Sequence, residues 1–370
     1  MKFSTRAIHV PGARHEGAIA PPIHLSTTFE HGPANERVVN YEYVRSGNPN
    51  VNELETRLAS LEGGVAALAY ASGMAASNAL MSSIPRGSEV LIHADTYYDT
   101  RTIAREFMEP LGIRHRVIDL TDDDAVDTAL SRNTAMVWLE TPSNPRLDIL
   151  DIAALAEKAH SVGAKLTVDG TFATPAVQQP LALGADYVMH SMTKFMGGHS
   201  DIMGGALVFR DDSELAARLG RQRTLSGAVL SPFNAWLIAR GLQTLDCRLE
   251  RHATNALLIA NMLEAHPAVE RTNYPFLESA PGYRIAKRQM RSGGGMLSFE
   301  MAGGRDAALR VASRVQLFVN ATSLGGVESL IEHRASIEGP DSASPDNLLR
   351  VSVGLEHPDD LLADLEVALG

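Results

Sequence analysis

Short runs of β-branched and apolar residues alternate with amphipathic stretches between residues 89 and 210, and this alternation constrains the fold more than any other feature. The runs typical of strands are EVLIH, HRVIDL, AMVWLE, AKLTVD, ADYVMH and GGALVF, which begin at Glu89, His115, Ala135, Ala164, Ala185 and Gly204. Between them lie helical segments such as DIAALAEKAHSVG, which Asp151 can cap and Gly163 can end. The pattern predicts a mostly parallel sheet covered by helices on both faces.

The flanking segments predict two further parts. Residues 1–50 are rich in His, Pro and Gly and show no sustained period, which is typical of an arm that lies on its own body or on a neighbouring subunit. Residues 51–230 contain the α/β pattern. Residues 231–370 begin with a long helical stretch, weakest at Gly241, followed by strand and helix patterns. We therefore predict a large domain, a linking helix and a smaller C-terminal domain.

Composition limits the partners and the compartment. The 370 residues include 33 Lys and Arg against 44 Asp and Glu, a net charge of −11, which argues against nucleic-acid or anionic-membrane partners. The single cysteine, Cys247, cannot form an internal disulfide, and the first residues lack the apolar run of a signal peptide. The histidines show no ligand pair at helical spacing, so no metal site is expected. We expect a cytoplasmic protein without a membrane span.

The segment HSMTKFMGGHSD, which follows a predicted strand, contains the most informative residue, Lys194. A lone lysine is most often a solvated surface residue. Here, however, Ser191 and Thr193 offer two hydroxyls to an anion, and the glycines that follow let the backbone approach a ligand closely. A lysine beside a phosphate cradle at the carboxyl end of a strand lies where open α/β sheets bind cofactors.

Asp169 ends the preceding predicted strand in LTVDGTF. It can be a helix cap or a turn former. Alternatively it is a buried carboxylate that keeps a pyridine nitrogen protonated, the partner that pyridoxal 5′-phosphate (PLP) needs to act as an electron sink. The interval from Asp169 to Lys194 is long enough for one crossover between adjacent parallel strands. The two side chains can therefore face the same crevice.

Three weaker motifs complete a candidate cofactor site. In ASGMAA, the amides of Gly73 and Met74 can bind phosphate at a helix N-terminus, although many ordinary helices begin this way. ETPSNP presents Asn144 after a strand, which equally suits a plain loop. DTYYDT offers Tyr97 for stacking, although core packing is the commoner role of an isolated tyrosine. Together the five motifs supply every contact that PLP requires.

The motifs YEYVRSGNPN, ASGMAA, ETPSNP, VDGTF, HSMTKFMGGHSD, SLGGVESL and LLRVSVGLE resemble those of the Cys/Met-metabolism PLP enzymes, the group of cystathionine γ-synthase, cystathionine γ-lyase, cystathionine β-lyase and methionine γ-lyase. The resemblance covers nearly the whole chain. It implies the aspartate-aminotransferase-like (type I) PLP fold, an α/β fold with a mostly parallel sheet in the large domain and a smaller α+β C-terminal domain. It also implies a homotetramer built from two active dimers.

The resemblance further implies a role for each motif residue. Lys194 would carry PLP and move protons, Asp169 would pair with the ring nitrogen, and Tyr97 would stack on the ring and help to deprotonate the incoming amine. The implied phosphate ligands are Gly73, Met74, Ser191 and Thr193, joined by Tyr43 and Arg45 from the arm of a neighbouring subunit. The implied ligands of the substrate carboxylate are Arg350, Asn144 and the Ser323 backbone.

Several residues depart from the family pattern. Tyr98 and Asp99 stand where members often have two glycines, or the glycine and reactive cysteine of methionine γ-lyases. Thr322 replaces a frequent glutamate, and Gly170 stands where asparagine is usual. The segment from Ile331 to Leu349 is shorter than in typical members, which predicts a more open site entrance.

Two acidic residues bear on the choice of substrate. Glu42 matches an acidic residue that γ-synthases and γ-lyases place near the distal end of the substrate. With Asp99 it would form a pair of carboxylates that prefers a cationic distal group, such as the ammonium of cystathionine or the guanidinium of canavanine. Arg101 lies near enough in sequence to neutralise Asp99 instead.

The leading hypothesis is a PLP-dependent lyase or transferase that performs γ-elimination or γ-replacement on a homocysteine- or homoserine-derived amino acid such as cystathionine. The alternatives are a cystathionine γ-synthase-type transferase that uses an O-acylhomoserine, a cystathionine β-lyase, and a non-catalytic protein that binds a phosphate ligand. The last alternative leaves Asp169 and Lys194 without a purpose.

Overall fold

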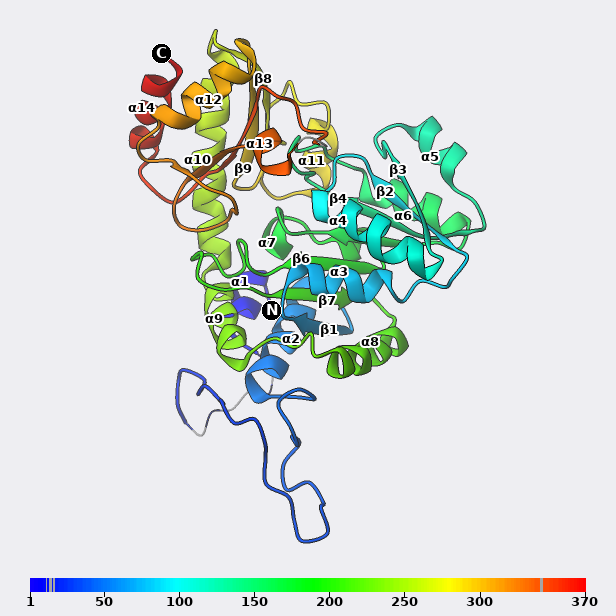
Figure 1. The fold of residues 1–370 in the computed structure, drawn as a ribbon. Coiled ribbons are helices and arrows are strands. Elements are labelled where there is room, and N and C mark those ends of the chain that lie inside the picture. The colour runs from blue at the N-terminus through cyan, green and yellow to red at the C-terminus, as the bar shows by residue number, and fades with distance from the viewer. Residues whose placement is uncertain (11, 13–14, 16, 340–341) are drawn as a thin grey trace.

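Seven strands form the larger of two sheets, in the order β1-β7-β6-β5-β4-β2-β3 (Figure 1). The computed structural model describes residues 1–10, 12, 15, 17–339 and 342–370. The strands are β1 (Ala66–Tyr70), β2 (Glu89–His93), β3 (Arg114–Ile118), β4 (Thr134–Glu140), β5 (Lys165–Asp169), β6 (Tyr187–Ser191) and β7 (Gly205–Phe209). Only β7 runs against its neighbours; the other pairs are parallel. The six predicted runs correspond to β2 through β7, which confirms the α/β prediction.

The first strand, β1, escaped prediction because its sequence AALAY is rich in alanine, which has a weak preference for strands. It pairs antiparallel with β7 at the edge of the sheet. The central strands are buried on both faces. Val188 of β6 packs into one hydrophobic core, whereas Tyr187 and Met189 pack into the other, as the alternation of side chains along a strand requires.

Helices cover both faces of the large sheet, and α10, α12 and α14 pack on a face of the small one (Figure 1). The predicted helix is α6 (Ile152–Ser161), where Asp151 Oδ1 accepts a hydrogen bond from the Ala154 amide at 3.3 Å. The others are α1 (Phe3–Ile8), α2 (Pro49–Glu62), α3 (Gly73–Met81), α4 (Tyr98–Ile103), α5 (Asp123–Ala129), α7 (Thr174–Val177), α8 (Ser213–Ser226), α9 (Pro232–Leu242), α10 (Leu245–Ala265), α11 (Tyr283–Gln289), α12 (Gly304–Arg314), α13 (Arg334–Glu338) and α14 (Pro358–Leu369).

The predicted linking helix is two helices, α9 and α10, separated at residues 243–244. The break lies next to Gly241, where a Cβ atom would stand 2.6 Å from the carbonyl oxygen of Met196 and 2.5 Å from that of Gly197. Only glycine lets α9 approach the loop that follows Lys194 this closely. The linker therefore supports the site directly.

The smaller sheet has the order β10-β11-β12-β9-β8. Its strands are β8 (Val269–Asn273), β9 (Met296–Met301), β10 (Val319–Asn320), β11 (Leu330–His333) and β12 (Leu348–Ser352). Antiparallel pairing of β11 with β12 sets Glu332 opposite Arg350. Helices α10, α12 and α14 share a hydrophobic core with this sheet. A second, smaller α+β unit therefore follows the large one, as the sequence predicts.

The N-terminal segment divides into a packed part and an extended part. Phe3 and Ala7 on α1 are buried in the main core, so the first helix belongs to this chain's own body. The chain that follows it leaves the body as a long excursion before α2 (Figure 1). There Ile19, Leu25 and Val38 are 98%, 67% and 57% exposed. The predicted arm is thus this later part, and its apolar residues lie uncovered in one chain.

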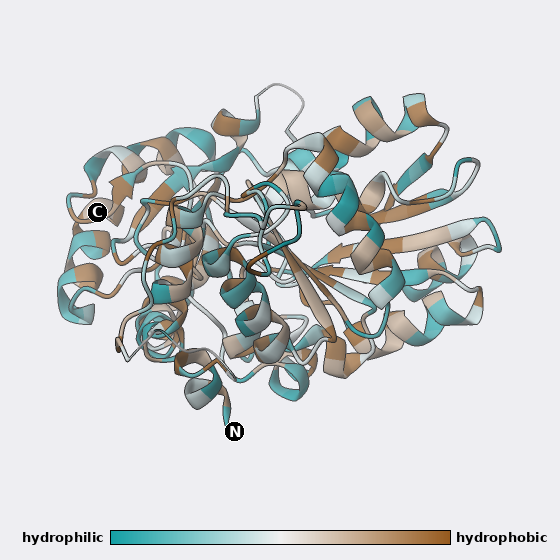
Figure 2. Ribbon diagram, turned by 90° about the horizontal axis from the view of Figure 1, so that it is seen from below, coloured by the Kyte–Doolittle hydropathy of each residue, from teal (hydrophilic) through white to brown (hydrophobic). Residues whose placement is uncertain are grey.

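Polar and apolar residues separate as expected for a folded body in water. Figure 2 shows the strands of the large sheet largely in brown, whereas the helices around them carry teal stretches. Within the described residues, every helix is too short or too polar to cross a bilayer. The same residues contain no cluster of His, Cys, Asp or Glu suited to a metal ion.

Candidate active site

A cavity of about 530 Å³ opens at the carboxyl ends of β4, β5 and β6. This is the edge of an open α/β sheet at which ligands bind. The sequence-predicted residues that line it are Gly73, Met74, Tyr97, Asp99, Asn144, Asp169, Ser191, Thr193, Lys194, Ser323 and Arg350. Segments far apart in the sequence therefore meet at one place, with both sheets contributing.

Lys194 lies in the loop after β6, with its amine inside the cavity. Its Nζ donates a hydrogen bond to Ser323 Oγ at 2.9 Å. Burial lowers the pKa of Lys194 to about 8, and the positive charge of Arg350 adds to the effect. The amine is therefore easier to deprotonate than that of an ordinary lysine. Its partner Ser323 has a φ of 84°, a left-handed conformation that is strained for a residue with a side chain.

Asp169, the last residue of β5, is held by Thr171. Its Oδ1 accepts hydrogen bonds from the Thr171 amide at 3.0 Å and from the Thr171 hydroxyl at 2.5 Å. Burial raises the pKa of Asp169, while the hydrogen bonds from Thr171 oppose the rise. Because both bonds go to one oxygen, Oδ2 is left for a donor inside the cavity.

The proposed phosphate cradle lies at the start of α3. Ser72 caps this helix by accepting a hydrogen bond from the Ala75 amide at 3.1 Å, and Gly73 and Met74 of its first turn line the cavity. A Cβ atom at Gly73 would lie 3.0 Å from the Cβ of Ser191, so a side chain there would fill the cradle. The Thr193 hydroxyl, predicted as a further phosphate ligand, is already hydrogen-bonded to Gly204. It donates to the Gly204 carbonyl at 3.3 Å and accepts from the Gly204 amide at 3.1 Å.

Arg350, on β12, faces the cavity from the small sheet and is only 4% exposed. Its Nη1 donates to Asn144 Oδ1 at 2.9 Å, and its Nη2 donates to the Ser323 carbonyl at 3.1 Å. Glu332 on β11 forms ion pairs with Arg350 at 2.5 Å and with Arg334 at 3.1 Å. Arg350 therefore contacts both of the other residues predicted to hold the substrate carboxylate.

Comparison with known proteins identifies the family. The sequence model of the family of Cys/Met metabolism PLP-dependent enzymes matches residues 4–370. The chain belongs to this family. It is 46% identical to cystathionine γ-synthase of Mycobacterium tuberculosis, covering 99% of this chain and 96% of that protein. It is 42% identical to cystathionine γ-lyase of Dictyostelium discoideum, and the match covers 100% of this chain and 97% of that protein. A crystal structure of metB from Corynebacterium glutamicum superposes with a TM-score of 0.97 at 42% sequence identity. The match covers 100% of this chain and 98% of that chain.

Membership in the Cys/Met family makes this chain a PLP-dependent enzyme with the type I fold. The residues present fit the cofactor. Oδ2 of Asp169 is available to a pyridine nitrogen, the first residues of α3 line the cavity where their amides would hold a phosphate, and the buried Lys194 amine can react with the aldehyde. Each of these three contacts lies on the lining of the same cavity.

Cofactor uptake by the apoenzyme is expected to rise with pH, with a midpoint at about 8, and to level off above it. The sign follows from the lowered pKa of Lys194, because only the unprotonated amine attacks the aldehyde of PLP. Replacing Arg350 with leucine should move the midpoint upward, since its positive charge contributes to the lowering. Rapid-mixing absorbance measurements over a range of pH test this; a wild-type midpoint near that of a free lysine would contradict it.

The hydroxyl of Tyr97 donates a hydrogen bond to Asp99 Oδ2 at 2.8 Å. Burial raises the pKa of Tyr97 to about 12, and Asp99 adds to the rise. In this arrangement the phenol keeps its proton at neutral pH. Help from Tyr97 in deprotonating an incoming amine would therefore require the bond to Asp99 to break, whereas stacking on the ring would not.

The arm residues predicted for the site lie outside this chain's cavity. Glu42 accepts a hydrogen bond from Arg37 at 2.7 Å on the exposed arm. Arg45 donates to the Thr224 carbonyl at 2.9 Å, and its guanidinium lies 5.5 Å from the centre of the Tyr43 ring. The two carboxylates Glu42 and Asp99 are therefore not brought together within one chain.

Sequence reasoning missed several residues of the cavity wall. Glu140 ends β4 and accepts a hydrogen bond from the Tyr97 amide at 2.7 Å; burial raises its pKa well above the ordinary value. Its place at the start of the ETPSNP motif was an available signal. Arg334 and Glu338 on α13 line the cavity and pair with each other at 3.0 Å. Their place beside the cavity depends on the pairing of β12 with β11, the strand directly before α13. No local pattern in the sequence reveals that pairing.

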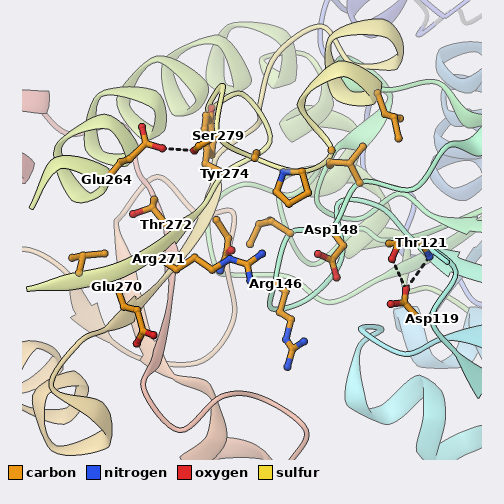
Figure 3. Close-up of a pocket in the computed structure, with 18 residues that line it drawn as sticks. Asp119, Thr121, Arg146, Asp148, Glu264, Glu270, Arg271, Thr272, Tyr274 and Ser279 are labelled. Carbon is orange, nitrogen blue, oxygen red and sulfur yellow. Dashed lines mark hydrogen bonds between the residues drawn. The ribbon is translucent and has the colours of Figure 1, made fainter.

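A second cavity, of about 680 Å³, lies between the loop at residues 146–149 and strand β8 (Figure 3). On one side Ser279 donates to Glu264, and on the other Asp119 accepts from Thr121 (Figure 3). Its lining contains none of the residues predicted for the site. It is therefore separate from the PLP site.

Proposed function

We propose that this enzyme acts at Cγ of a homocysteine- or homoserine-derived amino acid such as cystathionine, by γ-elimination or γ-replacement. One observation carries the proposal: Ser323 contacts both the amine that must move protons and the arginine that would bind the substrate. Its side chain accepts from Lys194 at 2.9 Å, and its carbonyl accepts from Arg350 at 3.1 Å. An amino acid whose carboxylate binds Arg350 would therefore have its Cα beside Lys194.

The residues divide the chemistry among them. When bound, PLP supplies an electron sink that stabilises negative charge at Cα. Lys194, whose pKa burial lowers, would in its unprotonated form take the Cα proton and return it at later steps as the γ substituent leaves. Asp169 would hold the ring nitrogen, and Asn144 would keep Arg350 oriented toward the substrate.

A preference for a cationic distal group rests on Asp99, because Asp99 lines the cavity and Glu42 of the same chain does not. Arg101 does not neutralise Asp99 directly, since its Nη1 donates to the Ala94 carbonyl at 2.9 Å. Arg334 lines the same cavity and brings a positive charge of its own. These residues make canavanine a substrate to assay beside cystathionine, with Asp99→Gly as the variant that removes the carboxylate.

Product analysis tests the proposal. Purified holoenzyme is incubated with cystathionine, methionine, canavanine and an O-acylhomoserine, the last with and without cysteine. Release of 2-oxobutyrate indicates γ-elimination, and formation of cystathionine from the acylhomoserine and cysteine indicates replacement. Pyruvate from cystathionine would show β-elimination and overturn the assignment to Cγ. A colourless protein that gains no PLP and forms no product would support the non-catalytic alternative.

The arm supports a second part of the proposal, that each active site is completed by a neighbouring subunit. Tyr43 is 45% exposed and the arm's apolar residues are uncovered, which is unfavourable for a segment surrounded by water. We infer a homotetramer of two active dimers in which Tyr43 and Arg45 reach the partner's phosphate site. The exposed thiol of Cys247, with no second cysteine in the chain, supports a reducing, cytoplasmic location.

Mixing Arg45→Ala with the inactive Lys194→Ala, at a PLP concentration too low to fill the weakened sites, is expected to restore activity if the arm acts in trans. Arg45→Ala should weaken PLP binding by about tenfold or more, the usual effect of losing a hydrogen bond to a charged group. Lys194→Ala should be inactive by itself. A mixed dimer contains one site with both Lys194 and a partner's Arg45. Turnover after unfolding and refolding the two together measures this, and a mixture no more active than its parts would contradict it.

A further inference from the structure

Arg334, the first residue of α13, is a second arginine on the wall of the active-site cavity, and the proposed function leaves it without a task. Its side chain is only 6% exposed. It follows β11 directly and lies in the segment that is shorter than in typical family members. A guanidinium this far from water needs partners that match its charge, so its contacts show what it can still bind.

Two carboxylates fix the Arg334 side chain. Its Nε donates to Glu338 Oε1 at 3.0 Å, and its Nη1 donates to Glu332 Oε1 at 3.1 Å. Glu338 is held in turn by the hydroxyls of Ser342 at 2.6 Å and Ser344 at 2.9 Å. A side chain held at two of its three nitrogens has little rotamer freedom left to lose when a ligand binds. The guanidinium is therefore positioned before a substrate arrives.

The third nitrogen of Arg334 remains open. Within the described residues, Nη2 has no hydrogen-bond partner, and it is not one of the polar atoms that are sealed inside the protein. Because Arg334 lines the cavity, Nη2 is the nitrogen that can donate to a ligand there. Arg350 is fixed next to it, since Glu332 Oε1 contacts both guanidiniums, at 3.1 Å and 2.5 Å. The cavity wall thus carries two separate donors for anionic groups.

The carboxylate of Asp99 lines the same cavity, and Tyr97 connects it to Arg334. The Tyr97 hydroxyl donates to Asp99 Oδ2 at 2.8 Å. Cζ of Arg334 lies 5.9 Å from the centre of the Tyr97 ring, within reach of a cation–π contact. One positive and one negative group therefore stand beside the same ring on the cavity wall.

The far end of cystathionine carries the two groups that this arrangement can bind. When Arg350 holds the carboxylate next to the reacting Cα, the other end of cystathionine is a second amino acid, with its own carboxylate and ammonium. A free cysteine that replaces a γ substituent brings the same two groups. Methionine has neither of them at its far end, and canavanine has only a cation. A fixed guanidinium and a carboxylate therefore favour an amino-acid end over a neutral or a purely cationic one.

We propose that Arg334 is a specificity-determining residue: its open Nη2 binds the carboxylate of the distal amino-acid end, and Asp99 binds the ammonium of that end. The inference rests on the proposed function, because it requires Arg350 to hold the reacting end of the substrate. It names the substrate class as a compound with an amino-acid group at both ends, or cysteine as the incoming nucleophile, in preference to methionine and canavanine.

The test compares compounds that differ by one group at the distal end. For elimination they are cystathionine, S-(2-aminoethyl)homocysteine, which lacks the distal carboxylate, and S-(2-carboxyethyl)homocysteine, which lacks the distal ammonium. For replacement on an O-acylhomoserine they are cysteine, cysteamine and 3-mercaptopropionate. Each compound is assayed with wild-type, Arg334→Gln and Asp99→Asn holoenzyme, and the readout is the ratio of kcat/KM between compounds.

Arg305→Gln is the matched control, because Arg305 contacts α13 from outside the cavity. Its Nη2 donates to Ser336 Oγ at 3.1 Å, and its Nη1 pairs with Asp346 at 2.9 Å. The variant removes a guanidinium that steadies α13 without touching the active-site cavity. Its ratios of kcat/KM should therefore match those of wild type.

Wild type should prefer the compound with the distal carboxylate over the one without it by about tenfold or more, the effect of one charged hydrogen bond. Arg334→Gln should bring this ratio close to one by slowing only the carboxylate-bearing compound, and Asp99→Asn should lower only the preference for the ammonium. If Arg334→Gln does not fold, Arg334→Lys, which keeps the charge but not the fork, should lower the same ratio by less.

A wild-type ratio near one would overturn the proposal whatever the variants do, and so would an equal loss on both compounds in Arg334→Gln. Pyruvate from cystathionine, or the absence of any turnover, would instead overturn the proposed function. The two failures are therefore distinguishable, because the ratio is read only from an enzyme that releases 2-oxobutyrate or forms a replacement product.

Discussion

Replacing Lys194 with alanine is expected to lower turnover by roughly a thousandfold or more, within the range that a positioned acid–base group contributes. The buried amine is the group placed to bind PLP covalently and to move the Cα proton, and its contact with Ser323 at 2.9 Å would be lost. Borohydride reduction followed by peptide mass spectrometry should find PLP on Lys194 in wild type and on no peptide of the variant.

Lys165→Ala is the matched control, because Lys165 lies at the other end of β5, where it pairs with Asp186 at 3.1 Å. It removes the same kind of side chain from the same sheet without touching the cavity. Its activity and its covalent label on Lys194 should match those of wild type. A Lys194→Ala enzyme that keeps its turnover, or that carries the label on another lysine, would refute the assignment.

Replacing Arg350 with leucine should lower kcat/KM by about a hundredfold to a thousandfold, mainly through substrate binding. The side chain is 4% exposed and contacts Asn144, Ser323 and Glu332. Its loss removes the fork for a carboxylate and leaves Glu332 with Arg334 as its remaining partner. Breaking a buried ion pair of this kind costs about 3–5 kcal/mol, so the melting temperature should fall as well.

Two comparisons separate binding from stability in this variant. Arg350→Lys keeps the charge but not the planar fork, so it should fold better than Arg350→Leu and still bind the substrate poorly. The decarboxylated amine of the best substrate has no group for Arg350, and wild type should therefore discriminate strongly against it. If Arg350→Leu retains that discrimination, Arg350 does not bind the carboxylate.

Local patterns were sufficient for six of the seven strands of the large sheet, all but β1. Alternating apolar runs mark β2 through β7 because each strand buries one or both faces, and Asp151 marks the start of α6 because it can accept the free amides there. Motif residues that follow strands could also be assigned to one site, because the carboxyl ends of parallel strands meet at one edge of the sheet. Asp169 and Lys194 were predictable on this basis.

Pairings between distant segments were not predictable. Glu332 meets Arg350 through the register of β11 and β12, and His190 meets Glu62 across 128 positions of the chain. Neither pairing leaves a local signature, because each residue by itself looks like an ordinary polar side chain. The hydrogen bond from Tyr97 to Asp99 was also missed, although the two are close in sequence, since its effect on the phenol depends on burial.

By itself the sequence determined the α/β class, the family and the cofactor, and it indicated candidate site residues that line one cavity, because these depend on short-range periodicity and on motifs whose chemistry is local. Only the tertiary structure decided which charges surround those residues and which atoms remain free for a ligand. The physical reason is that burial and ion pairing depend on which segments meet in space. The cost of isolating a charge from water, as at Arg350, is set by that whole arrangement.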